Sequence, residues 1–168
     1  MTRRTLTVLT FSLAAFWIAL DQLTKLWAET ALVGQPRTPI LGGWFGLVLV
    51  YNPGAAFGLG SGFVWVLTVI AGIAVVVLVV VALRTHTLLW SLAIGSMLGG
   101  AVSHFFDRLL RGDTIGTGKI VDFIDYGGFF VGNIADIALV GAAIGSVLLS
   151  FFGVSFSSAE RPKPAPKQ

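Results

Sequence analysis

Four long stretches of this sequence contain no Asp, Glu, Lys or Arg, and they constrain the fold more than any other feature. They lie between Arg4 and Asp21 (extendable to Trp27), and over residues 63–83, 85–106 and 137–159. A charge at mid-bilayer costs about 2.5–3.5 kcal/mol, whereas Leu and Val are favoured there. A helix needs about 20 residues to cross the hydrocarbon. We therefore predict one all-α integral membrane domain over residues 1–154, with spans at about 6–27, 63–83, 87–106 and 134–153.

The composition agrees with a membrane protein and excludes several function classes. Only 11% of residues are charged and 55% are hydrophobic, against about 25% charged in soluble domains. The net charge of +3 is spread over separate stretches, which argues against a nucleic-acid-binding face. The chain has no cysteine, so disulfides, thiolate nucleophiles and cysteine metal sites are excluded.

The two ends of the sequence resemble processing or linker segments and need separate interpretation. Arg3 and Arg4 precede an apolar run, as in a signal peptide, but no small-residue cleavage site follows. We expect this run to be retained as the first span. The Pro-rich segment 155–168 predicts a disordered cytoplasmic tail.

A short apolar segment between the first two long runs is expected to form a strand rather than a span. Residues 40–51 are too few and too rich in glycine to cross a bilayer. The part from Leu47 to Tyr51 runs into the turn signal Asn52-Pro53-Gly54. We predict a small extracytoplasmic sheet, within about 38–61, with a broken re-entrant helix as the alternative.

The charges divide unequally between the two sides that four spans define. Both ends and the second loop together have six basic residues and one acid, whereas the other two loops have five basic residues and seven acids. The positive-inside rule places both termini in the cytoplasm. Asp21 and Lys25 would lie about 22 and 28 Å along the first span, near the outer boundary. We therefore expect the acids to gather at the outer leaflet.

Two of these acids are candidates for hydrolytic chemistry. Asp122 lies in the apolar frame Ile120–Ile124, and Asp136 begins the last span just after Asn133. Two carboxylates close together in a low dielectric share a proton, so the charged one can activate water while the protonated one hydrogen-bonds a carbonyl. A Gly-rich connection could bring them together. This pattern favours aspartic proteolysis without a covalent intermediate.

Structural roles are the alternative for the other polar residues. We expect Asp107 and Arg108 to form a helix-end ion pair, and Asp125 to be a solvated loop acid. Asp21 and Lys25, at i,i+4 spacing, can neutralise each other on one helix face.

Other reaction classes find less support in the sequence. His104 and Asp107 lack an obvious third metal ligand, so we expect no metal. No spacing supports a Ser–Lys dyad. A small four-helix proton-coupled transporter is the rival from another class, but it predicts acids near mid-bilayer and internal symmetry. Neither feature is present in the sequence.

Five sequence blocks together resemble the lipoprotein signal peptidases (signal peptidase II), an aspartic peptidase family of bacterial membranes. They are Asp21–Lys25, residues 51–58 (YNPGAAFG), Asp107-Arg108, Ile120–Phe123 and Asn133–Asp136. The resemblance implies catalytic residues at Asp122 and Asp136. It implies substrate-binding or supporting residues at Asp21, Lys25, Asn52, Gly54, Asp107, Arg108 and Asn133.

The resemblance also implies a substrate, a place and a fold. The protein would cut diacylglyceryl-modified prolipoproteins before the lipidated lipobox Cys, without a metal or an organic cofactor. It would work as a monomer among membrane lipids in the bacterial cytoplasmic membrane, bind globomycin-type inhibitors, and have a small β-cradle. An inactive relative that binds lipoproteins without cutting them is the alternative within this resemblance.

The chain departs from the family pattern at two places. Ser103-His104 stands where the family usually has Gly-Asn before Asp-Arg, and Gly132 stands where Phe usually precedes the last Asn. His104 can donate or accept a hydrogen bond as Asn can, but it is larger and can become charged near neutral pH. We therefore include His104 among the supporting residues and expect it to affect pocket shape and pH response.

Overall fold

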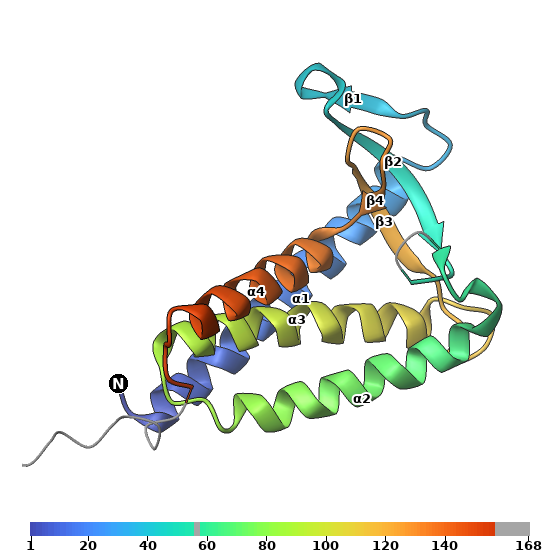
Figure 1. Ribbon diagram of the computed structural model, residues 1–168. Coiled ribbons are helices and arrows are strands. Elements are labelled where there is room, and N and C mark those ends of the chain that lie inside the picture. The colour runs from blue at the N-terminus through green and yellow to red at the C-terminus, as the bar shows by residue number, and fades with distance from the viewer. Residues whose placement is uncertain (56–57, 157–168) are drawn as a thin grey trace, which may run out of the picture.

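The computed structural model of the chain describes residues 1–55 and 58–156. It has four long helices and a small sheet at one end of the helix bundle (Figure 1). Almost all of the tail expected over 155–168 lies outside the described residues, as do Ala56 and Phe57 of the block at 51–58.

Four helices in the described part of the chain are long and apolar enough to cross a membrane. They are α1 (Arg3–Ala31), α2 (Val64–Ala82), α3 (Leu88–Leu110) and α4 (Ile134–Phe151). The prediction of four membrane-spanning helices with a small sheet is therefore confirmed. α1 and α3 continue past the charge-free runs, because Lys25 and Asp107 pair inside the bundle instead of facing lipid.

α3 lies at the centre of the bundle and packs against the other three helices. Two glycines allow this close packing. A Cβ added at Gly99 would lie 2.7 Å from the carbonyl oxygen of Ala14 in α1, and one at Gly100 would lie 2.7 Å from that of Ala135 in α4. Such small residues let helix backbones approach closely in membranes. The α3–α4 contact therefore holds the start of α4, which includes Asp136, firmly against the bundle.

α2 has a different character from α3. It is apolar on all sides, and only Thr68 and Ala82 are buried within it. A helix of this kind suits a lipid-facing position. A short 3₁₀ turn, Ser61–Phe63, leads into it.

The four-stranded antiparallel sheet combines two distant parts of the chain in the order β1-β2-β3-β4. β1 (Thr38–Ile40) and β2 (Phe45–Asn52) come from the loop after α1, whereas β3 (Ile120–Asp125) and β4 (Val131–Gly132) come from the loop before α4. The strand expected over Leu47–Tyr51 lies inside β2. The expectation of a sheet within 38–61 missed β3 and β4, because strand pairing between distant loops leaves no local sequence signal.

The sheet packs on the end of α1, away from the N-terminus (Figure 1). Ala28, Leu32 and Phe123 form the buried apolar cluster beneath it. β2 pairs with β3 so that Val50 lies opposite Asp122, with a register irregularity between Leu47 and Val50. This pairing puts Asp122 beside the N-terminal end of α4.

Candidate active site

Asp136 is held at the first turn of α4 by a reciprocal capping arrangement. The side chain of Asn133, the N-cap residue, accepts a hydrogen bond from the Asp136 N–H at 3.0 Å, while Asp136 Oδ2 accepts one from the Asn133 N–H at 2.9 Å. Such a capping box satisfies helix N–H groups that otherwise lack partners. It also fixes one oxygen of the Asp136 carboxylate.

The same Asn133 side chain connects Asp136 to Asp122. Its Nδ2 donates to Asp122 Oδ1 at 2.6 Å and to the Val121 carbonyl oxygen at 3.3 Å. Asn52 Nδ2 donates to the other Asp122 oxygen at 3.2 Å, and Asn52 Oδ1 accepts the Gly54 N–H at 2.9 Å. One amide therefore bridges the two acids, and a second amide orients Asp122 from β2.

Asp122 has the chemical character of a proton-carrying acid. The residue is only 3% exposed. Burial, followed by the negative charge of Asp136, raises the pKa of Asp122 to about 7, although the hydrogen bonds from Asn52 and Asn133 oppose the rise. Near neutral pH, Asp122 can therefore carry a proton beside Asp136.

His104 approaches the same two groups from α3. Its Nε2 lies 3.2 Å from Asn133 Oδ1 and 3.5 Å from Asp136 Oδ1. The imidazole is therefore positioned against the Asp136 oxygen that Asn133 leaves free.

Arg108 holds the loop that follows β2. Its guanidinium donates to the carbonyl oxygens of Pro53 at 2.9 Å, Gly118 at 3.3 Å and Gly54. Asp107, its neighbour in sequence, instead binds Lys25 of α1. The expected Asp107–Arg108 ion pair is therefore wrong, because adjacent helical side chains point about 100° apart.

A second pair of carboxylates forms a closed charged cluster between α1 and α3. Lys25 Nζ lies 2.5 Å from Asp21 Oδ2 and 2.6 Å from Asp107 Oδ2, and all three side chains are fully buried. Asp21 Oδ1 accepts the Ala135 N–H at 2.8 Å. Asp21 and Lys25 do neutralise each other, as expected, but they also tie α3 and the first turn of α4 to α1.

Gln22, Ser103 and Arg111 complete this cluster and were missed by the sequence analysis. Ser103 Oγ donates to Asp21 Oδ2 at 2.7 Å, and Gln22 Nε2 donates to Asp107 Oδ1 at 2.9 Å. Arg111 Nε also donates to Asp107 Oδ1, at 2.9 Å. The i,i+4 spacing of Asp107 and Arg111 and of Ser103 and Asp107 was an available signal.

Asp125 was expected to be solvated, and this was wrong. It is the last residue of β3, 2% exposed, and it pairs with Arg37. The hydrogen bond from the Arg37 side chain, together with one from the Gly128 N–H, keeps the pKa of Asp125 below its usual value. Asp125 lies opposite Gly46 in the sheet. Because Gly46 has no side chain, the Arg37 guanidinium can lie over it and bury Asp125.

The candidate dyad opens into a cavity of about 1080 Å³. Asn52, His104 and Arg108 line its polar end together with the two acids, and apolar residues of α2 and α4 line the rest. Gly132 leaves the approach to Asp136 open, since a Cβ there would lie 2.9 Å from Asp136 Oδ2 and 3.2 Å from the Phe130 ring. Phe130 stacks on Tyr126, with centroids 4.4 Å apart, and both rings line the cavity. Neither aromatic was identified from the sequence.

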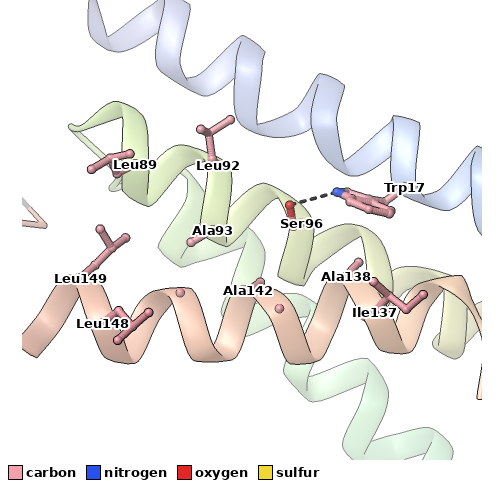
Figure 2. A pocket seen from close by; sticks show the side chains of 12 residues that line it. Trp17, Leu89, Leu92, Ala93, Ser96, Ile137, Ala138, Ala142, Leu148 and Leu149 are labelled. Atoms are coloured by element: carbon pink, nitrogen blue, oxygen red, sulfur yellow. Dashed lines mark hydrogen bonds between the residues drawn. The ribbon is translucent and has the colours of Figure 1, made fainter. Parts of the chain in front are cut away.

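A second hollow, of about 480 Å³, lies along α3 and α4 and lacks such chemistry (Figure 2). Its wall consists mainly of Leu, Ala and Gly residues. The polar contact drawn there is a 2.9 Å hydrogen bond from Trp17 Nε1 to Ser96 Oγ. Its described lining residues include no ionisable group, so the first cavity is the candidate active site.

Comparison with known proteins identifies the family. The family described as Signal peptidase (SPase) II matches residues 13–152, a range that includes every residue of the candidate site. A protein named lipoprotein signal peptidase from Bifidobacterium adolescentis is 41% identical over 85% of this chain and 76% of its own length. Another of that name, from Mycobacterium avium, is 41% identical over 94% of this chain and 86% of its own length.

A solved structure agrees with this result. The structure of a protein described as a bacterial membrane enzyme superposes with a TM-score of 0.76 at 28% identity, over 92% of this chain and 94% of that chain. Sequence, fold and site geometry thus lead to one conclusion: the chain belongs to the signal peptidase II family of membrane peptidases.

Proposed function

We propose that this membrane peptidase removes the signal peptide from diacylglyceryl-modified prolipoproteins, with Asp122 and Asp136 as its catalytic pair. The observation that best supports this proposal is the bridge through Asn133, which binds Asp122 with its amide and caps Asp136 with its oxygen and N–H. Two acids held by one rigid group can share a water molecule and a substrate carbonyl between them.

In the proposed reaction, Asp136 begins ionised and Asp122 begins protonated. A water molecule loses a proton to Asp136 as its oxygen attacks the scissile carbonyl carbon, while Asp122 donates a hydrogen bond to the carbonyl oxygen. The tetrahedral intermediate then collapses, the C–N bond breaks, and the proton on Asp136 passes to the leaving nitrogen. The raised pKa of Asp122 supports its assignment as the protonated partner.

The shape of the cavity supports a substrate that lies partly in lipid. Its polar end holds the acids, whereas Leu67, Ile70, Val140 and Ile144 form apolar walls from α2 and α4. Acyl chains and an apolar signal peptide suit such walls, and the scissile bond would reach the polar end. We propose cleavage before the lipidated Cys, and the same cavity as the site of globomycin-type inhibitors.

The charge distribution supports an orientation in the bacterial cytoplasmic membrane. Arg3 and Arg4 are in the first turn of α1 and Arg84 follows α2, and these helix ends lie opposite the sheet (Figure 1). We propose that this end is cytoplasmic, that the active site lies at the outer leaflet, and that residues 1–154 act as a monomeric domain. The supporting roles of Asp21, Lys25, Gly54, Asp107 and Arg108 are to position the helices and the loop after β2.

A cleavage assay with purified protein tests the proposal. Wild-type protein should release the signal peptide from a diacylglyceryl prolipoprotein and leave the unmodified prolipoprotein uncut. Asp122→Asn and Asp136→Asn should both abolish release, whereas Asp113→Asn, at an exposed loop acid, should not. Binding without release by wild-type protein would support the inactive-relative alternative. Release by either dyad variant at the wild-type rate would refute the dyad.

A further inference from the structure

His104 makes its contacts with the candidate dyad through a single ring nitrogen. Nε2 lies between Asn133 Oδ1, at 3.2 Å, and Asp136 Oδ1, at 3.5 Å. The imidazole side chain is mostly buried, at 17% exposed, whereas the Asp136 side chain is 34% exposed. The ring therefore forms a wall of the site on the side of Asp136 that faces α3.

The surrounding hydrogen bonds determine which ring nitrogen carries the hydrogen. Asn133 Nδ2 is used in donating to Asp122 Oδ1 and to Val121, so the amide oxygen is the atom that faces His104. A carboxylate oxygen of Asp136 is the second neighbour. Both neighbours of Nε2 are acceptors, and Nε2 must therefore be the protonated nitrogen of the neutral ring.

This arrangement gives the two Asp136 oxygens different partners. Oδ2 accepts the Asn133 N–H at 2.9 Å, and Oδ1 faces the Nε2–H of His104. A carboxylate held at both oxygens has little rotational freedom, which is what a general base needs in order to meet a water molecule in a fixed direction.

We propose that His104 is a positioning residue that orients the ionised Asp136 through Nε2–H, and that a second proton on its imidazole suppresses Asp136 as a base. The proposal rests on the proposed role of the Asp122–Asp136 pair. When Nδ1 takes a proton from solvent, the ring becomes a cation beside Asp136. A carboxylate paired with a cation accepts a proton from water less readily.

The other ionisable groups around His104 have assigned partners or different chemistry. Those that line the same cavity in the described chain are Tyr51, Arg108, Asp122, Tyr126 and Asp136. Arg108 binds three backbone carbonyl oxygens, and Lys25 of α1 is held by Asp21 and Asp107. α2, on the far side of the cavity, has no ionisable residue. Among the described residues that line the cavity, His104 is the one imidazole, and an unperturbed imidazole is the side chain that changes charge between pH 5 and 8.

The pH dependence of kcat/KM should separate the two acids. Loss of the Asp122 proton produces the alkaline limb of the profile, because burial and Asp136 raise the pKa of that carboxyl to about 7. Under the proposal, the second proton on the His104 ring suppresses Asp136 and so lowers kcat/KM on the acid side of the profile. A change at His104 should therefore move the acid limb and leave the alkaline limb in place.

The test compares three variants with wild type in the cleavage assay over pH 4.5–9. In His104→Gln, an uncharged amide N–H extends about as far from the backbone as Nε2 does. In His104→Leu, this hydrogen-bond donor is absent. His86→Gln, in the loop after α2 at the other end of the bundle, is the matched histidine control. The size-exclusion elution profile and the melting temperature of each protein establish that it is folded.

His104→Gln should keep cleavage and move its acid limb to lower pH, because the cation no longer forms beside Asp136. His104→Leu should lower kcat on the order of 100-fold with a smaller change in KM, through loss of orientation. His86→Gln should match wild type. Any of three results would overturn the inference. The acid limbs of wild type and His104→Gln could coincide, the folded His104→Gln protein could be inactive, or His104→Leu and His104→Gln could have equal kcat. Failure of the dyad itself would appear separately, as cleavage by Asp136→Asn.

Discussion

The molecule holds two pairs of carboxylates within a few helical turns of each other, and they have opposite environments. Asp21 and Asp107 share the ammonium group of Lys25, and all three side chains are fully buried. The side-chain partners of Asp122 and Asp136 are the amides of Asn52 and Asn133 and the ring of His104, and this pair opens into a cavity.

The comparison shows that aspartates in one fold can stabilise the structure at one place and carry out chemistry at another. A cation between two buried acids removes their reactivity and fixes three helices. Amides orient the other pair without neutralising it, so burial and mutual repulsion can raise the pKa of Asp122. We therefore expect changes in the Lys25 cluster to affect stability, and changes in the dyad to affect cleavage.

The largest effect on stability should follow Lys25→Met. This change leaves Asp21 and Asp107 buried without their cation, and breaking such a pair typically costs about 3–5 kcal/mol. We expect a large fall in melting temperature in detergent, partly restored by adding Asp21→Asn. Lys119→Met, at an exposed residue, is the control. A Lys25→Met protein as stable as wild type would remove the distinction between the two pairs.

Asn133 belongs to both the fold and the dyad, so its variants separate the two contributions. Asn133→Ala should lose the helix cap, at about 0.5–2 kcal/mol, and lower cleavage on the order of 100-fold by misplacing the acids. Asn133→Ser keeps a capping oxygen but has no amide to reach Asp122. We expect it to retain most of the melting temperature and to show the same loss of cleavage. Equal cleavage by Asn133→Ser and wild type would refute the role of the bridge.

The raised pKa of Asp122 predicts that stability depends on pH. The folded state favours the protonated carboxyl, so its contribution to stability is complete below the ordinary pKa of 3.8 and is lost as pH rises to about 7. Melting temperatures measured over pH 4–8 should fall with rising pH in wild type, and less steeply in Asp122→Asn. Parallel curves for the two proteins would contradict the assignment.

The smallest effect should come from the Arg37–Asp125 pair, which joins the residue before β1 to the end of β3. Asp125 is buried, but Arg37 is partly exposed and the Gly128 N–H still binds the carboxylate, so loss of this pair should cost less than loss of the fully buried Lys25 pairs. Arg37→Leu should lower the melting temperature less than Lys25→Met and leave kcat unchanged. A large fall in kcat would show that the sheet positions Asp122 through this contact.

The fold was predictable from sequence where the signal is local. Four charge-free runs predicted four spans because the cost of a buried charge acts on each residue separately. The apolar frame around Asp122 and the position of Asp136 at the start of a span indicated the two candidate acids. The pairing of β2 with β3 was not predictable, because its strands are separated by two helices.

The partners of individual charges were also hard to predict. Arg108 follows Asp107 in sequence but binds the loop after β2, while Asp107 binds Lys25 more than 80 residues away. Asp125 appeared solvated only because Arg37 lies far from it in the chain. Such contacts depend on how helices and strands pack, and sequence spacing describes only neighbours within one element.

Asp136 takes part in the helix cap, but only the reaction requires the charge of its carboxylate. The most direct test measures cleavage of a diacylglyceryl prolipoprotein and melting temperature on the same preparation of Asp136→Asn. We expect no detectable cleavage at a melting temperature close to that of wild type, since Asn can still accept the Asn133 N–H. Cleavage near the wild-type rate, or a loss of stability as large as that expected for Lys25→Met, would contradict this expectation.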